Sequence, residues 1–215
     1  MSEFRGFIFD IDGTITSTYD LIFASFNYVA EKYLHKSFTN DEMASLFGPT
    51  EEVILRELMN GNYEEARKDY FDFYTKRHNE MADIFPGIRE ALQFIKSRHL
   101  PISIYTGKGK KSAEITLRKI GVYDYFDMIV TGDDVENFKP SPEGIIKFLD
   151  KFKLECDKVL MIGDSVVDIE AAKGAGVRSA LVLWDSYSSA NADNHGADYV
   201  FTSVGQFNKF LREME

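Results

Sequence analysis

Two carboxylates, Asp10 and Asp12, lie two positions apart directly after a short apolar segment near the start of the chain. A carboxylate can attack phosphorus and form an acyl phosphate, and a second acid can carry the proton that this chemistry requires. Gly13 permits a sharp turn, and the backbone N–H groups of such a turn, including that of Thr14, suit phosphate oxygens. By itself the pair could equally cap a turn. It does not match an EF-hand calcium loop, which needs glycine at its sixth position, where this chain has Ile15.

Further residues that suit phosphate or metal binding follow three other strand-like segments. One segment is followed by a threonine, a glycine and a lysine, one by a loop that ends in a lysine, and one by two aspartates about a helical turn apart. Each of these residue types alone is common at a strand end or on a surface. In open α/β sheets, however, ligands bind at the carboxyl ends of the strands, so we expect these side chains to converge with Asp10. They are Thr106, Gly107, Lys108, Lys139, Asp164 and Asp168.

Short apolar segments alternate with amphipathic ones over most of the chain, which predicts the sheet that positions those residues. The apolar segments are rich in Ile, Val, Phe and Tyr and are continuous rather than alternating, as expected of buried parallel strands. Strands that alternate with helices indicate an α/β fold, here a Rossmann-like doubly wound parallel sheet. We predict strands at residues 4–9, 102–105, 127–130, 159–162, 179–183 and 199–201, and helices at residues 88–97, 110–120, 142–152, 166–175 and 204–212.

Residues 17–84 interrupt this alternation. They contain no convincing strand, and their apolar residues recur at helical spacing over residues 21–33, 41–46, 52–58 and 63–78. Pro86 and Gly87 mark the return to the alternating pattern. We therefore expect an all-helical cap domain at residues 17–84, inserted after the first strand of an α/β catalytic core that is formed by residues 1–16 and 85–215.

The composition is that of an ordinary globular protein, with 44% hydrophobic and 28% charged residues among 215. The formal net charge of −10 argues against general nucleic-acid binding, which needs a basic face, but not against a phosphate substrate beside a metal ion. Cys156 is the only cysteine, so no intramolecular disulfide can form. The N-terminus has no signal-peptide pattern and no apolar run reaches membrane-spanning length, so we expect a cytoplasmic location.

The four motifs that carry the candidate chemistry are, in order, Asp10-Ile11-Asp12-Gly13-Thr14, Thr106, Lys139 before Pro140, and Gly163-Asp164 with Asp168. Their types and order resemble the four motifs of the haloacid dehalogenase superfamily of phosphohydrolases. The helical segment lies where that superfamily inserts a C1-type cap, so the resemblance covers the whole chain. Within the superfamily, the chain looks most like the branch of phosphoglycolate phosphatases and pyrophosphatases.

The resemblance implies a Mg²⁺-dependent phosphatase in which Asp10 takes up the phosphoryl group and Asp12 moves the proton. Mg²⁺ would lie between Asp10, the backbone carbonyl of Asp12 and Asp164, which is an oxygen-ligand set that it prefers. Asp168 would orient this group of ligands rather than bind the metal. The phosphate oxygens would be held by Thr106 and Lys139, with further contacts from Gly13, Thr14, Gly107 and Lys108.

Two other functions are compatible with the same residues. A phosphosugar mutase of the same superfamily would use the same aspartyl phosphate, although Thr14 stands where some mutases carry valine. A receiver-like regulatory domain also combines a phosphoacceptor aspartate, a hydroxyl and a lysine at strand ends, but Asp12 and the helical insertion favour turnover over signalling. As partners we expect a small phosphorylated metabolite, such as phosphoglycolate, a sugar phosphate or a nucleoside monophosphate, with no nucleic acid and no membrane. We expect the chain to be a monomer or a weak homodimer.

Overall fold

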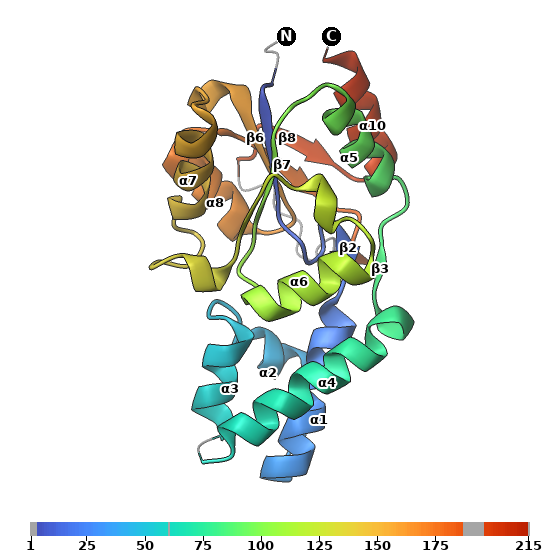
Figure 1. Ribbon diagram of the computed structural model, residues 1–215, viewed down its shortest axis with the longest axis vertical. Coiled ribbons are helices and arrows are strands. Elements are labelled where there is room, and N and C mark those ends of the chain that lie inside the picture. Colours follow the sequence, from blue (N-terminus) through green and yellow to red (C-terminus); the bar gives the residue numbers. More distant parts are fainter. Residues whose placement is uncertain (1–3, 60, 187–195, 215) are drawn as a thin grey trace.

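The computed structural model describes residues 4–59, 61–186 and 196–214 of the chain. Six parallel strands form its central sheet: β1 (Gly6–Phe9), β4 (Ile102–Tyr105), β5 (Met128–Val130), β6 (Val159–Gly163), β7 (Arg178–Val182) and β8 (Tyr199–Phe201). Their order across the sheet is β5-β4-β1-β6-β7-β8 (Figure 1). Because the strand order reverses at β1, the carboxyl ends of β1, β4 and β6 flank the crevice where such sheets bind ligands. The predicted α/β doubly wound fold is confirmed.

Helices on both faces of the sheet explain why its strands are continuous apolar runs. These helices are α5 (Ile88–Ser97), α6 (Lys110–Lys119), α7 (Glu143–Phe152), α8 (Val166–Ala175) and α10 (Val204–Glu213). Within the described ranges, three short 3₁₀ helices lie in the connections, at Tyr123–Tyr125, Gly132–Asp134 and Cys156–Lys158. In β1, Phe7 and Phe9 pack in one cluster with residues of α5, α6 and α10, whereas Ile8 packs in another with residues of α7 and α8. Alternate side chains of one strand therefore enter two separate cores.

Four helices between β1 and β4 pack on one another beyond the carboxyl edge of the sheet (Figure 1). They are α1 (Tyr19–Leu34), α2 (Asn40–Ala44), α3 (Glu51–Met59) and α4 (Tyr63–Met81), and we call them the cap helices. They bury an apolar cluster of their own, in which Phe26, Leu55 and Tyr70 exclude solvent. Neither these helices nor the others in the described ranges are long and apolar enough to cross a bilayer.

The prediction that residues 17–84 contain no strand is wrong at both ends of that segment. β2 (Thr16–Ser17) and β3 (Asp83–Ile84) form a small antiparallel sheet, in which Thr16 lies opposite Ile84. The Thr16 hydroxyl also donates a hydrogen bond of 2.6 Å to the carbonyl oxygen of Asp83. Strands of two residues have no periodicity to detect, and this pairing joins positions 67 apart in the chain. This small sheet joins the two points where the chain passes between the central sheet and the cap helices.

Candidate active site

A cavity of about 270 Å³ lies between the carboxyl edge of the sheet and the cap helices. Residues that follow four different strands line its floor. Aromatic and aliphatic side chains from the cap helices and from the loop after α2 line the opposite side. Of the residues predicted from the sequence, the structure brings together Asp10, Asp12, Thr106, Gly107, Lys108, Lys139 and Asp164 in this lining, whereas Gly13, Thr14 and Asp168 lie outside it.

Lys139 is the centre of a buried ion-pair network. Its Nζ donates to Asp10 Oδ1 at 2.8 Å, to Asp168 Oδ1 at 2.5 Å and to the carbonyl oxygen of Tyr105 at 3.3 Å. Burial raises the pKa of Asp10 to about 6, although the charge of Lys139 opposes this shift. Burial alone would lower the pKa of Lys139, but the carboxylates of Asp10 and Asp168 outweigh it and hold the pKa above its ordinary value. This lysine therefore stays charged at neutral pH.

Asp168 is held by the first turn of α8. Its Oδ2 accepts hydrogen bonds from the backbone N–H of Ser165 at 3.1 Å and from the Ser165 hydroxyl at 2.7 Å, in a capping-box arrangement. Gly163 at the end of β6 leaves the space for this carboxyl group, because a Cβ there would lie 2.2 Å from the Asp168 carboxyl carbon. Both oxygens of Asp168 are thus engaged, one by the helix and one by Lys139, so this residue positions the lysine.

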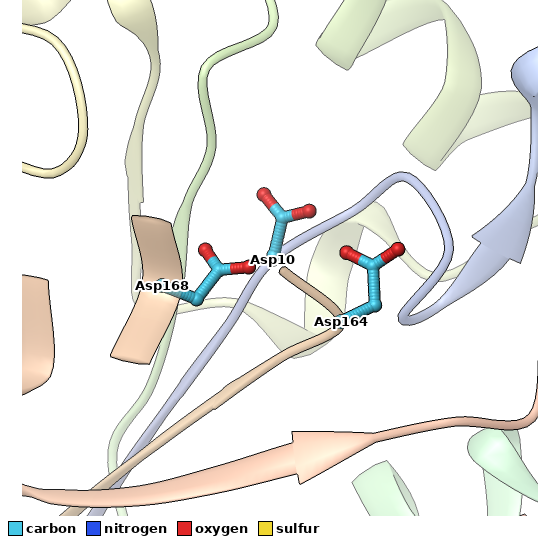
Figure 2. A group of neighbouring side chains, drawn as sticks. All are labelled: Asp10, Asp164 and Asp168. Atoms are coloured by element: carbon cyan, nitrogen blue, oxygen red, sulfur yellow. The ribbon is translucent and has the colours of Figure 1, made fainter. Parts of the chain in front are cut away.

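Three carboxylates lie within reach of a single cation at this edge of the sheet. One oxygen each of Asp10, Asp164 and Asp168 lies within 4.8 Å of the others (Figure 2). Because Asp168 is already engaged, Asp10 and Asp164 are the pair best placed to hold an ion. Carboxylate oxygens are the ligands that hard divalent cations such as Mg²⁺ prefer, so these residues fit that ion. The Tyr19 hydroxyl donates to Asp164 Oδ2 at 3.0 Å and orients this carboxylate.

Lys108 and Asp12 form a second buried ion pair, which a residue of the cap helices joins. Lys108 Nζ lies 3.1 and 3.2 Å from the two carboxylate oxygens of Asp12, and 3.4 Å from Glu51 Oε1 at the start of α3. The Thr18 hydroxyl also donates to Asp12 Oδ1. Burial alone would lower the pKa of Lys108, but Asp12 and Glu51 outweigh it and keep the pKa above its ordinary value. The charge of this lysine is therefore shared between two carboxylates.

Glu51 connects the cap helices to α6, and sequence reasoning missed it. Its Oε2 accepts from the backbone N–H of Gly109 at 2.7 Å, and its Oε1 accepts from the Ser112 hydroxyl at 2.6 Å. Gly109 is the N-cap residue of α6 and has no side chain to satisfy the N–H groups of the first turn, so the carboxylate of Glu51 does so. In the sequence, Glu51 and Glu52 look alike as acids in the first turn of an amphipathic helix, and no local signal separates the buried one from the other.

The loop after β1 and the residue after β4 relate differently to the cavity. Gly13 has a φ of +74°, which favours glycine, and the N–H groups of Gly13 and Thr14 donate to carbonyls within the loop, at 2.9 and 3.3 Å. The Thr14 hydroxyl is buried without a hydrogen-bond partner in the described part of the chain. Thr106 lines the cavity, and its hydroxyl oxygen accepts from the N–H of Lys108 at 3.2 Å. The Thr106 proton is therefore available to a ligand, whereas Gly13 and Thr14 shape the loop.

A doubly wound α/β sheet with a buried aspartate–lysine pair, a carboxylate cluster and a helical layer above them defines a hydrolase of the phosphatase class. Comparison with known proteins gives the same result. The chain belongs to the haloacid dehalogenase-like hydrolase family, whose model matches residues 7–182. This match runs from β1 to β7 and includes every residue of the candidate site.

Individual relatives match over nearly the whole chain. A proposed pyrophosphatase PpaX of Caldanaerobacter subterraneus subsp. tengcongensis is 31% identical over 205 residues, which are 95% of this chain and 93% of the relative. The structure of a proposed β-phosphoglucomutase from Thermotoga maritima has a TM-score of 0.74 at 30% identity and covers 97% of this chain and 99% of its own. A predicted phosphoglycolate phosphatase of Haemophilus somnus has a TM-score of 0.83, over 98% of this chain and 99% of its own, but at 19% identity this likeness shows the fold alone.

Proposed function

We propose that this chain hydrolyses phosphate monoesters of small metabolites, with Asp10 as the nucleophile and Mg²⁺ as the cofactor. The observation that carries the proposal is the buried Asp10–Lys139 pair next to Asp164, at the carboxyl edge of the sheet and beneath the cap helices. Phosphoryl transfer depends mainly on positioning and on stabilisation of charge, and these groups can supply both. The substrate classes in question are phosphoglycolate-like acids, sugar phosphates and nucleoside monophosphates.

In the first step, a carboxylate oxygen of Asp10 attacks the phosphorus atom while the bond from phosphorus to the leaving oxygen breaks. Asp12, which lines the same cavity, donates a proton to that oxygen, so the product departs as an alcohol. Lys139 and the hydroxyl of Thr106 contact the phosphate oxygens, and the charge of the lysine offsets the negative charge of the substrate. Gly107 lies in the lining beside Thr106, and we assign it to the same oxygens.

In the second step, Asp12 works as the base. Its carboxylate accepts a proton from a water molecule that attacks phosphorus, the bond to Asp10 breaks, and inorganic phosphate leaves. The proton that Asp12 takes up restores the protonated form that donates in the first step of the next turnover. Thr18 and Lys108 hold the Asp12 carboxylate at the cavity wall, so it is in place for both proton transfers. We therefore assign Lys108 to Asp12 and Glu51 rather than to the phosphate.

Asp10 and Asp164, together with the backbone carbonyl of Asp12, would hold the Mg²⁺ ion. When bound, this ion polarises the phosphate and neutralises part of its charge. We also propose that residues 17–84 act as a cap domain on the core of residues 1–16 and 85–215. The apolar side that the cap helices present to the cavity supports this assignment, because it would exclude water before transfer.

Phosphate release by the variant Asp10→Asn tests the mechanism. Asparagine is nearly isosteric with aspartate, so the fold should be kept while activity with Mg²⁺ falls to background. EDTA should abolish the activity of the unmodified protein, and added Mg²⁺ should restore it. Asp20→Asn is the matched control, since Asp20 is an exposed aspartate in the first turn of α1 and should be neutral. Full activity of Asp10→Asn would show that Asp10 is not the nucleophile.

The similarity to the proposed β-phosphoglucomutase favours one further candidate function, a phosphosugar mutase. A mutase would return the phosphoryl group of Asp10 to a sugar rather than to water. Incubation with a ³²P-labelled sugar phosphate separates the two functions. A hydrolase releases the label as inorganic phosphate, whereas a mutase leaves it in an isomerised sugar phosphate.

A further inference from the structure

The cap helices and the loop after α2 present a mainly apolar side to the cavity, although Tyr19 and Glu51 also line it. Ile22 and Phe26 of α1, Phe47 of the loop after α2, and Ile54 of α3 line it. Ile22, Phe26 and Ile54 are each at most 5% exposed and pack in the apolar cluster of the cap helices. Because Asp10 would take up the phosphoryl group at the opposite side, this surface lies where the leaving group of the substrate must be accommodated.

The ring of Phe47 belongs to a cluster of three aromatic rings, of which Phe47 and Tyr19 line the cavity, and we call this part of the lining the aromatic wall. The Phe47 ring stacks on Tyr19, with ring centroids 6.4 Å apart and planes at 25°, and on Phe23, with centroids 5.7 Å apart and planes at 21°. The Tyr19 hydroxyl donates to Asp164, so the wall is attached to the carboxylates of the site. Phe47 itself remains 38% exposed. An aromatic or aliphatic ring packs well on such a wall, in an offset stack or edge to face.

The lysines that line the cavity already have partners for their positive charges. The cations among the described lining residues are Lys139, which we assign to the transferred phosphate, and Lys108, which lies within 3.4 Å of the carboxylates of Asp12 and Glu51. A divalent cation at Asp10 and Asp164 would serve the transferred phosphate. An anionic leaving group would meet the apolar wall and the carboxylate of Glu51, and a buried anion without a partner is costly.

We infer that the preferred substrates carry an uncharged, apolar leaving group of about one ring, and not a carboxylate or a second phosphate. The inference rests on the proposed phosphatase function, and among the substrate classes given there it excludes the phosphoglycolate-like acids. The size follows from the cavity, whose volume of about 270 Å³ must also contain the transferred phosphate. The chemical preference follows from the aromatic wall and from the absence, in the described lining, of a cation that is not shared by two carboxylates.

Benzyl phosphate and 2-phosphoglycolate are a matched pair of substrates for this question. Both are esters of small primary alcohols, and they differ mainly in whether a ring or a carboxylate meets the wall. With saturating Mg²⁺, kcat/KM for benzyl phosphate should exceed that for 2-phosphoglycolate by about 10-fold or more, a range that pocket contacts of this size supply. Pyrophosphate should also be the poorer substrate, although its leaving group departs more easily.

Variants of Phe47 test whether the aromatic wall causes this preference. Phe47→Ala should lower kcat/KM for benzyl phosphate by about 2- to 10-fold, which is the effect of one aromatic contact, and should leave 2-phosphoglycolate nearly unchanged. Phe47→Arg adds a cation and should raise kcat/KM for 2-phosphoglycolate. Tyr28→Ala is the control, because Tyr28 is a cap aromatic of similar exposure, 40%, that stacks on Phe73 and does not line the cavity.

The outcomes separate this inference from the proposed function. If kcat/KM for 2-phosphoglycolate or pyrophosphate is higher than that for benzyl phosphate, the inference is overturned, whereas the phosphatase function still stands. Equal effects of Phe47→Ala on both esters would also overturn it. If none of the three substrates, and no sugar phosphate or nucleoside monophosphate, is hydrolysed at any Mg²⁺ concentration, the proposed function and the inference are overturned together.

Discussion

The variant Glu51→Ala removes a carboxylate that joins the cap helices to α6. The Glu51 side chain is 7% exposed, accepts hydrogen bonds from Gly109 and Ser112, and lies 3.4 Å from Lys108. A hydrogen bond to a charged group contributes about 1.5–3 kcal/mol and an N-cap about 1 kcal/mol. These effects overlap at the Gly109 N–H, and Lys108 keeps Asp12 as a partner, so we expect a loss of about 3 kcal/mol in the free energy of unfolding.

Thermal and urea unfolding measure this loss, and Glu52→Ala is the matched control. A loss of that size lowers the Tm of a chain of this length by roughly 6–12 °C. Glu52 is the next residue of the same helix and pairs with Arg67, but both side chains are about a third exposed, at 28% and 32%. A surface pair of this kind contributes about 0–1 kcal/mol, so Glu52→Ala should change the Tm by less than about 4 °C.

Hydrogen exchange supplies a local readout of the same change. The N–H of Gly109 should lose protection in Glu51→Ala and keep it in Glu52→Ala, because its acceptor is Glu51 Oε2. The reasoning is refuted if the two variants have the same stability within about 0.5 kcal/mol, the usual range for surface substitutions, while Gly109 remains protected in both.

Two further predictions concern packing and pH. Burial lowers the pKa of His78 to about 4, so the folded protein binds fewer protons than the unfolded chain between pH 6.5 and 4, and stability should fall as the pH drops through this window. His78→Gln can keep the hydrogen bond to Thr116. In this variant the free energy of unfolding, measured with urea, should differ less between pH 7 and pH 5 than it does in the unmodified protein. Gly144→Ala would place a Cβ 2.3 Å from the Tyr105 ring and should lower stability by about 1–3 kcal/mol. Gly205 is also the second residue of its helix, and a Cβ there would have its nearest contact at 3.8 Å. Gly205→Ala should therefore be neutral or raise the free energy of unfolding by about 0.5–1 kcal/mol. Equal effects of the two glycine variants would contradict the packing argument.

The sheet and the edge that carries the site follow from local features of the sequence. Continuous apolar runs predicted all six strands of the central sheet within two residues at each end, and α5 and α8 begin and end where they were predicted. The reason is that burial on both faces imposes an apolar residue at every position of a strand, which a short window of sequence displays. Once a parallel sheet is predicted, its carboxyl ends must meet at one edge, so Asp10, Thr106 and Asp164 were expected together there.

The contacts that set the electrostatics of the site were decided by the tertiary structure alone. The Lys108–Asp12 pair joins positions 96 apart, the contact of Glu51 with Ser112 joins positions 61 apart, and the β2–β3 pairing has strands too short to show a pattern. Lys108 looked like a phosphate ligand in the sequence, but its charge is shared between Asp12 and Glu51. Such pairs depend on burial and on where the cap helices lie over the sheet, and neither is encoded within any one segment. The sequence by itself therefore determined the fold and the chemical types gathered at the site, whereas the tertiary structure decided which charges are paired and which surface is left for the substrate.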